Sequence, residues 1–359
     1  MAHQFQACTS PATAYRRLRD GRARTAGRIQ LGYIRAVFVF TDFNKLFVGN
    51  MTCKIRVNII CVIIICVFII LPCSCTTPNL SHPSLPDDIA LTAKVGEEPI
   101  FLKLRLETGE ELLFMLDTGA PGTILDKSLE AKLGKRLGSR KSAYGWKANG
   151  KPTFGIYAAP TLYLGNVRLQ TGNQVYTDDL TRIWPGRPMM GILGMDCLQN
   201  YCVQLDFQAK KLRFLDADHL SDGDCGRAFP LTFNGCVFTR MDFFGDKSVR
   251  FMVDTAEYSD GALNADLFSL ALQMQESVWT QQWKQPNGTP TRQAYLSECA
   301  INNETYTNLV FWDCSMGAIR SQNMIGLHFL ARNLVTFNFP KRVMYLKQTS
   351  VGPLSNRNP

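Results

Sequence analysis

Residues 112–120 read Leu-Leu-Phe-Met-Leu-Asp-Thr-Gly-Ala, in which five apolar side chains run into a carboxylate and a tight turn. An apolar run of this length, bounded by turn residues, predicts a strand buried on both faces. Asp117 then stands at the end of a buried strand, where an unpaired carboxylate is costly. From this segment alone, the carboxylate is equally consistent with capping the next turn and with catalysis.

A second copy of the pattern occurs in residues 248–256, which read Ser-Val-Arg-Phe-Met-Val-Asp-Thr-Ala. Each copy follows another apolar stretch across a turn, residues 101–106 in one case and 237–244 in the other. This arrangement predicts two β-hairpins. The second copy supplies a second carboxylate, Asp254, and indicates an internal repeat.

The downstream sequence continues the repeat. An Asn-Gly turn signal at 149–150 is echoed at 287–288, and each half then closes with an apolar pair, a glycine, a short helix and a two-stranded hairpin. The closing glycines, Gly194 and Gly326, lie 77 and 72 residues after their respective Asp. Two unrelated β modules with common turn residues are the alternative, and the matching order favours the repeat.

The remaining strands are short, punctuated by Gly, Asn and Pro, and rich in β-branched and aromatic residues, as in β barrels. Helical character is confined to residues 126–137 and 265–283. The sequence therefore predicts an all-β fold of two tandem β-barrel lobes, residues 92–218 and 219–347, followed by a tail, 348–359. The boundary falls in a polar linker near 216–227.

The formal charge of +9 comes from the start of the chain. Residues 76–359 hold 29 basic and 28 acidic side chains, so the body is nearly neutral. A neutral body predicts no nucleic-acid partner.

Residues 1–75 predict a leader. Thirteen apolar residues at 59–71 follow two basic side chains and match the hydrophobic core of a secretory signal, with Met51 as an alternative start after residues 1–50. The segment before Cys75 resembles a bacterial lipoprotein box, with Cys75 as the lipidation candidate, and an uncleaved signal anchor is the competing interpretation. A Pro/Ser-rich tether, 76–91, follows. The sequence thus predicts an extracytoplasmic, membrane-anchored or secreted body.

The cysteines and histidines limit the kinds of disulfide, metal site and nucleophile that the body can form. The body contains six of the twelve cysteines, compatible with three disulfides in an exported chain: Cys197, Cys202, Cys225, Cys236, Cys299 and Cys314. No CxxC spacing occurs there, and few histidines lie beyond the leader. The sequence therefore predicts no metal site, no cofactor and no His-based nucleophile.

A repeat that packs around a pseudo-twofold axis would bring Asp117 and Asp254 face to face. Two carboxylates that close share one proton. The ionised one can activate water and the protonated one can polarise a carbonyl, which is acid–base catalysis of amide hydrolysis. Thr118 and Thr255 are then expected to hydrogen-bond across the axis.

The sequence at this point resembles the aspartic proteases of the retropepsin-like and pepsin-like group. The resemblance rests on Asp117-Thr118-Gly119-Ala120 with Ile192-Leu193-Gly194, and on Asp254-Thr255-Ala256 with Met324-Ile325-Gly326. It implies two β-rich lobes with a cleft between them. Gly119 and Ala256 are then expected to support the pair Asp117 and Asp254, which we call the dyad, and Gly194 and Gly326 to support the loops that carry it. It also implies a flap at residues 143–154, where Tyr144 or Trp146 could close over a substrate or simply pack.

The second motif departs from the family pattern. Ala256 stands where the family has glycine, which allows backbone angles that a Cβ disfavours. Ala256 therefore predicts a strained or reshaped site. Glu257 follows, either as a solvated turn residue or as a negative charge that favours the protonated dyad.

These features predict an aspartic endopeptidase that acts on polypeptides as a monomer. One alternative is a catalytically inactive module that binds peptides or an envelope polymer between the lobes. Another is a dimer in which Asp117 pairs with its copy in a second chain.

Overall fold

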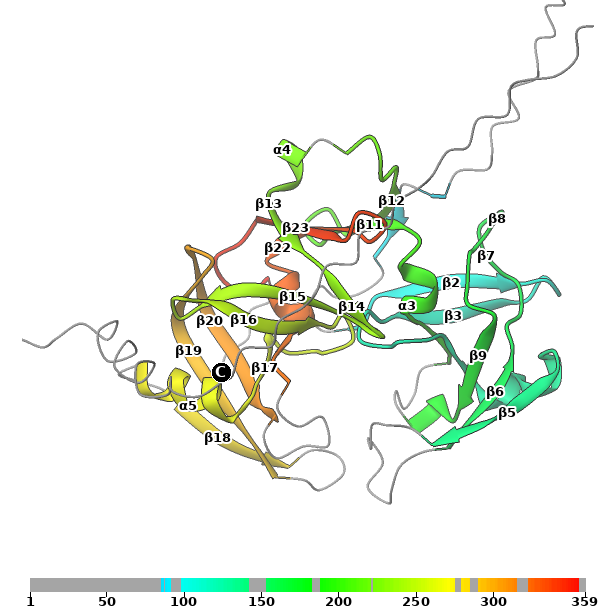
Figure 1. The fold of residues 1–359 in the computed structure, drawn as a ribbon, viewed down its shortest axis with the longest axis horizontal. Helices are drawn as coiled ribbons and strands as arrows, with labels where there is room; N and C mark the ends of the chain where they lie inside the picture. The colour runs from blue at the N-terminus through cyan, green and yellow to red at the C-terminus, as the bar shows by residue number, and fades with distance from the viewer. Residues whose placement is uncertain are drawn as a thin grey trace, which may run out of the picture. The chain divides into compact units, whose positions relative to one another are not determined.

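The computed structural model describes residues 85–86, 88–91, 98–141, 153–182, 188–220, 222–274, 279–284, 290–314 and 322–354. The chain divides into two units, residues 1–76 and 77–359, and every described residue belongs to the second. Strands dominate this part of the chain and helices are few and short (Figure 1). The predicted all-β class is confirmed.

A nine-stranded sheet contains the first Asp-Thr motif. Its strand order is β5-β6-β9-β4-β10-β3-β2-β7-β8. The strands are β2 (Phe101–Leu106), β3 (Glu111–Leu116), β4 (Ile124–Asp126), β5 (Arg136–Lys141), β6 (Thr153–Ala158), β7 (Leu162–Leu164), β8 (Val167–Arg168), β9 (Gln174–Asp178) and β10 (Met189–Leu193). The hairpin predicted from residues 101–106 and 112–116 is confirmed as antiparallel β2 and β3.

An eight-stranded sheet contains the second motif, in the order β14-β15-β16-β21-β17-β20-β19-β18. Its strands are β14 (Thr232–Asn234), β15 (Cys236–Phe243), β16 (Asp246–Val253), β17 (Gly261–Leu263), β18 (Trp279–Lys284), β19 (Pro290–Ile301), β20 (Glu304–Asp313) and β21 (Met324–Ile325). Antiparallel β15 and β16 confirm the second predicted hairpin. Positive φ angles at Phe244 and Gly245 form its two-residue turn, as expected for a tight hairpin.

A six-stranded sheet joins the hairpins that close the two halves, in the order β1-β12-β11-β22-β23-β13. Its strands are β1 (Ile89–Ala90), β11 (Cys202–Asp206), β12 (Lys211–Leu215), β13 (Arg227–Pro230), β22 (Asn333–Asn338) and β23 (Val343–Gln348). The red C-terminal strands in Figure 1 reach β11 because β22 pairs antiparallel with it. Ile89 and Ala90, predicted to lie in the tether, belong to this sheet as β1.

The helices are shorter than predicted. Within 126–137 only the 3₁₀ helix Lys127–Lys132 forms, and β5 follows, since Gly134 and the basic residues after it leave no apolar helical face. The helix predicted over 265–283 ends at Met274 as α5 (Ala265–Met274), and β18 takes up the Trp- and Thr-containing residues beyond. The predicted linker contains a short helix, α4 (Asp222–Cys225).

The main apolar core is continuous through all three sheets. β3 contributes Leu112, Phe114 and Leu116 to it, while Met115 on the opposite face is also buried and Leu113 is half-buried. The strand before Asp117 is therefore buried on both faces, as predicted. In the second half, the ring of Phe243 lies edge-on to the rings of Phe251 and Phe311, at centroid distances of 5.4 and 5.5 Å.

Two smaller apolar clusters lie apart from the main core. The first-half cluster contains Phe101, Met115, Ala120, Leu180, Met189 and Ile192. The second-half cluster contains Cys236, Phe238, Met252, Ala262 and Met324. Each takes side chains from the strand that leads into an Asp-Thr motif and from the strand that leads into a closing glycine.

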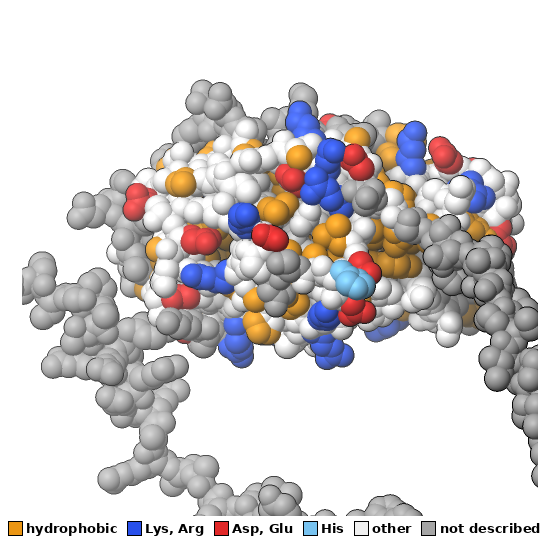
Figure 2. Space-filling model, turned by 90° about the horizontal axis from the view of Figure 1, so that it is seen from above, with side chains coloured by type: hydrophobic (Ala, Val, Ile, Leu, Met, Phe, Trp, Pro, Cys, Tyr) orange, Lys and Arg blue, Asp and Glu red, His pale blue; other side chains and the backbone are white. Residues whose placement is uncertain are grey.

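All six body cysteines are present as thiols, so the predicted disulfides are not formed. Five are buried, each in its own strand or short helix. On the face shown in Figure 2, Lys/Arg and Asp/Glu side chains are interspersed around apolar patches. Within the described ranges, no helix is long and apolar enough to cross a membrane.

Candidate active site

Each Asp of the repeated motif lies at the end of a buried strand and is fixed by a neighbouring strand. β10 runs parallel to β3 and antiparallel to β4, and the amide of Asp117 donates to the carbonyl of Leu193 at 3.1 Å. β21 stands in the same relation to β16 and β17, and the amide of Asp254 donates to Ile325 at 2.9 Å. The same three-strand arrangement thus positions both carboxylates.

The closing glycines let the loops that follow Asp117 and Asp254 pack closely against backbone. A Cβ at Gly194 would lie 2.5 Å from the carbonyl carbon of Gly122, and a Cβ at Gly326 would lie 2.3 Å from the carbonyl oxygen of Ser259. These distances are far below any Cβ contact, so neither position accepts a side chain. The short helices α3 (Met195–Leu198) and α6 (Leu327–Leu330) begin directly after them, as predicted.

Thr118 and Thr255 are fully buried and bind each other from opposite halves of the body. The amide of each donates to the hydroxyl of the other at 3.1 Å. The hydroxyls in turn donate to the carbonyls of Val253 at 2.7 Å and Leu116 at 2.9 Å. Four reciprocal hydrogen bonds therefore tie the two loops together where their Asp residues meet.

The carboxyl groups of Asp117 and Asp254 are hydrogen-bonded to each other. Each also accepts a backbone N–H two residues on, from Gly119 at 2.7 Å and from Ala256 at 2.8 Å. Gly119 leaves room for this approach, because a Cβ there would lie 2.4 Å from Asp254 Oδ2. The structure thus brings together the two carboxylates that the repeat singled out.

Burial is the largest influence on the acidity of this pair. It raises the pKa of Asp117 to about 6, against the lowering effect of the Gly119 and Ala120 amides. It raises the pKa of Asp254 to about 8, and the charge of Asp117 adds to the rise. Between these pH values the pair carries one proton and one negative charge, the state required to activate water and polarise a carbonyl together.

A comparison with protein families is consistent with this geometry. Residues 102–197 match the model of a family described as aspartyl protease. The match supports an aspartic protease family. It runs from β2 to α3 and so includes Asp117 and Gly194, whereas Asp254 lies beyond it. No curated protein matches the chain.

Ala256, where the family pattern has glycine, does not require a glycine backbone. Neither Gly119 nor Ala256 has a positive φ angle. The methyl group of Ala256 packs against the first-half cluster. The strain predicted for this position is therefore absent, because the loop reaches its conformation within the ordinary range of an L residue.

Glu257 does not face solvent as a turn residue would. Its carboxylate is half-buried and accepts from the Ser259 hydroxyl at 2.7 Å and from the Ser259 amide at 3.2 Å. Burial raises the pKa of Glu257, with a further rise from the charge of Asp254. Glu257 is therefore no solvated turn residue, and its carboxyl group interacts electrostatically with Asp254.

Two contacts at the site were not predicted from sequence. The thiol of Cys236 donates to the carbonyl of Gly119 at 2.9 Å, and burial raises the pKa of this thiol to about 11, which keeps the donor proton in place. The Tyr258 hydroxyl lies 3.7 Å from Met115 Sδ in the other half. The sequence offered no signal for either pair, because Cys236 and Tyr258 lie outside the repeated motif.

Several predicted residues lie outside the described part of the chain. These are the flap candidates Tyr144 and Trp146, the lipidation candidate Cys75 and the apolar run 59–71. In the part of the chain that is described, no group of three or more His, Cys, Asp or Glu side chains could hold a metal ion.

Proposed function

We propose that residues 92–347 form a single-chain aspartic endopeptidase with two tandem retropepsin-like lobes related by a pseudo-twofold axis. The observation that carries the proposal is the reciprocal exchange of hydrogen bonds between Thr118 and Thr255, which joins equivalent atoms of two loops. The matching three-strand arrangements that precede Asp117 and Asp254 support the same symmetry.

In the proposed reaction, a water molecule is held between the carboxyl groups of Asp117 and Asp254. Asp117, which ionises first, accepts a proton from this water as its oxygen bonds to the peptide carbonyl carbon. Asp254 gives its proton to the carbonyl oxygen. The tetrahedral intermediate then breaks its C–N bond as Asp117 passes its proton to the leaving nitrogen and one hydroxyl of the intermediate gives its proton to Asp254, which restores both carboxyl groups to their starting states. No covalent enzyme intermediate forms.

Buried apolar clusters support the strands that lead to the dyad in both halves. Met115 and Met252 stand two residues before their Asp, and Ile192 and Met324 stand two before their closing glycine. Met115 is paired with Ile192, and Met252 with Met324, on the neighbouring strand.

Both motifs belong to the same chain, and this supports a monomer over a dimer built from two copies of Asp117. The thiol state of the body cysteines gives no support for export, so the extracytoplasmic, membrane-anchored location rests on the leader sequence alone. Placing the body outside the cytoplasm, with a lipid or signal anchor in residues 51–75, remains part of the proposal.

The second candidate function is a peptide-binding module without activity, and the Ala256-Glu257 departure is the observation that favours it. Incubating the full chain with a peptide library in ¹⁸O-labelled water separates the two. The enzyme should yield fragments with ¹⁸O in the new carboxylate, and hydroxylamine should trap no acyl-enzyme. Peptides that bind tightly but remain intact from pH 4 to 9 would establish the binding module instead.

A further inference from the structure

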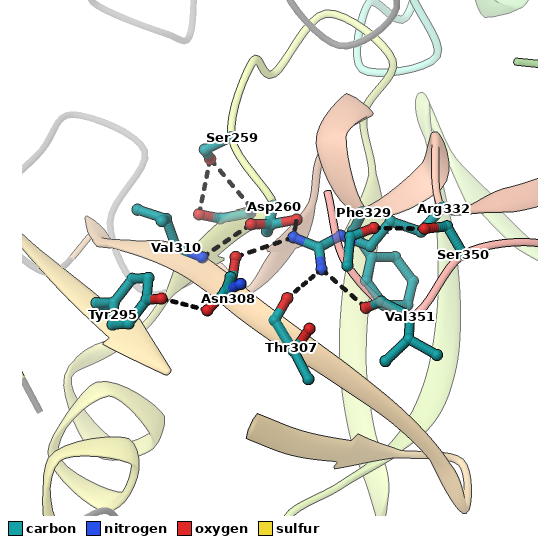
Figure 3. A network of polar contacts seen from close by, with 12 residues as sticks. Ser259, Asp260, Tyr295, Thr307, Asn308, Val310, Phe329, Arg332, Ser350 and Val351 are labelled. Carbon is teal, nitrogen blue, oxygen red and sulfur yellow. Dashed lines mark hydrogen bonds and ion pairs between the residues drawn. The ribbon is translucent and has the colours of Figure 1, made fainter. Parts of the chain in front are cut away.

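Arg332 is the largest fully buried side chain in the described part of the protein, and its charge is compensated from several directions. Its Nη2 lies 2.9 Å from Asp260 Oδ1, and the two side chains are only 1% and 4% exposed. The guanidinium also donates to the carbonyls of Thr307, Asn308 and Val351 (Figure 3). Burying an ion pair this completely costs free energy, so it contributes little to stability for its own sake.

Asp260 connects this ion pair to the dyad. It ends the loop that begins at Asp254, and its neighbour Ser259 holds Glu257. The Asp260 carbonyl accepts from the amide of Gly326 at 3.0 Å, and its Oδ2 accepts from the amide of Val310 at 2.8 Å. One residue thus fixes the end of the catalytic loop to both the closing glycine and strand β20.

The chain beyond the last strand completes the arrangement from the other side. The carbonyl of Arg332 accepts from the amides of Thr349 at 2.9 Å and Ser350 at 3.0 Å. The carbonyl of Val351 accepts from Arg332 and from the amide of Thr307 at 3.0 Å. Residues 349–351, which we call the C-terminal latch, therefore hold Arg332 in place.

The first half secures its loop differently. Thr123, six residues after Asp117 as Asp260 is after Asp254, donates to Asp196 at 2.8 Å. No arginine takes part in that contact. Of the two loops, only the one that carries Ala256 and Glu257 is thus held at this position by an ion pair.

We propose that Arg332 is a positioning residue for Asp254, and that the C-terminal latch is needed for catalysis although it lies far from the dyad in sequence. The inference rests on the proposed protease function. Through Asp260, Arg332 fixes the loop that carries Asp254, and the latch fixes Arg332.

The test compares full-length variants with matched controls. Arg332→Met removes the charge, Arg332→Lys keeps it, and the pair Asp260→Asn/Arg332→Gln replaces both charges with amides that can still bond. Truncation after Gln348 removes the latch, whereas truncation after Leu354 keeps it. Arg168→Met, on the exposed edge strand β8, is the control for loss of an arginine. Each variant is measured for Tm, for kcat and KM on a peptide, and for hydrogen exchange in residues 254–260.

Arg332→Met and the truncation after Gln348 should lower kcat by on the order of 10- to 100-fold, as expected when a catalytic group is misplaced by about 1 Å. KM should change little, and exchange in 254–260 should accelerate. Arg332→Lys should recover part of kcat, and both controls should match the parent. The amide pair should recover Tm but not kcat.

If the ion pair only stabilises the fold, kcat should stay at the parental level wherever Tm is recovered. Parental kcat in the amide pair or in the chain truncated after Gln348 would therefore overturn the inference. Should Arg332→Met fail to fold, Arg332→Lys and the truncations decide the matter by the same readouts. If the parent protein cleaves no peptide, the proposed function fails, but the exchange measurement still applies. Unchanged exchange in 254–260 after loss of the latch would then overturn the positioning claim by itself.

Discussion

The backbone amides of Thr118 and Thr255 each donate a 3.1 Å hydrogen bond to the hydroxyl of the other residue. Neither loop can shift alone without leaving buried donors unpaired, which costs about 1–3 kcal/mol for each group. The relative position of Asp117 and Asp254 is therefore set by the residues that directly follow them.

Replacing Thr118 by Val should lower both stability and activity. The change leaves the Thr255 amide and the Val253 carbonyl without their partner, so we expect a loss of about 2–6 kcal/mol in the free energy of unfolding, at about 1–3 kcal/mol for each group. Urea unfolding and kcat on a peptide substrate measure the two effects. Thr118→Ser should retain most of both.

A matched control separates the two losses. Thr239 is a buried threonine of β15 whose hydroxyl donates to the Pro230 carbonyl at 3.0 Å, within the second half. Thr239→Val leaves one buried group unpaired, so it should lose about 1–3 kcal/mol while kcat stays at the parental level. A similar drop in kcat for both variants would contradict a specific role for Thr118.

Replacing Gly119 by Ala should abolish activity, because the new methyl group would meet the Asp254 carboxylate at 2.4–2.8 Å. The reverse change at the equivalent position, Ala256→Gly, removes only a packed methyl group and should keep substantial activity. Cleavage rates and crystal structures of both variants check this asymmetry. Wild-type rates in Gly119→Ala would show that the dyad does not occupy the described geometry.

Activity should follow a bell-shaped dependence on pH centred near neutrality. The pKa of about 6 at Asp117 sets the acid side, where the dyad gains a second proton, and the pKa of about 8 at Asp254 sets the alkaline side, where it loses its only one. Measuring kcat/KM from pH 4 to 10 gives both limbs. An optimum below pH 5 would be inconsistent with these raised pKa values.

The same pKa values make the dyad a source of instability at neutral and alkaline pH. Because both folded-state pKa values lie above the ordinary value of 3.8, the folded protein binds more protons than the unfolded chain. The stability contributed by the protonated pair is complete at low pH and is lost as pH rises through about 6 and 8. Asp254→Asn should therefore gain stability over the parent between pH 5 and 9. The gain should exceed about 1.4 kcal/mol, the equivalent of one pKa unit.

Much of the site could be predicted because it depends on local pattern. An apolar run that ends in Asp-Thr indicates a buried strand with a carboxylate at its end. Its repetition in residues 248–256 supplies the partner of Asp117 without any knowledge of the fold. The closing glycines Gly194 and Gly326 followed from the same repeat, and their backbone contacts explain why each is a glycine.

Contacts of side chains outside the repeated motif with residues distant in sequence could not be predicted. Cys236 appeared as one of six disulfide candidates, and only the packing of the two halves places its thiol on the Gly119 carbonyl. Arg332 and Asp260, 72 residues apart, carry no motif that marks them as partners. Glu257 was misjudged because a charged residue in a turn usually faces water, whereas here Ser259 draws its carboxylate inward.

The most direct test of the central claim is the rate of peptide cleavage near pH 7 by the full-length protein and by Asp117→Asn and Asp254→Asn in parallel. Shared acid–base catalysis predicts that each variant loses on the order of 10²- to 10⁴-fold in kcat while remaining folded. Cleavage at the parental rate by folded Asp254→Asn would contradict a dyad formed by these two residues.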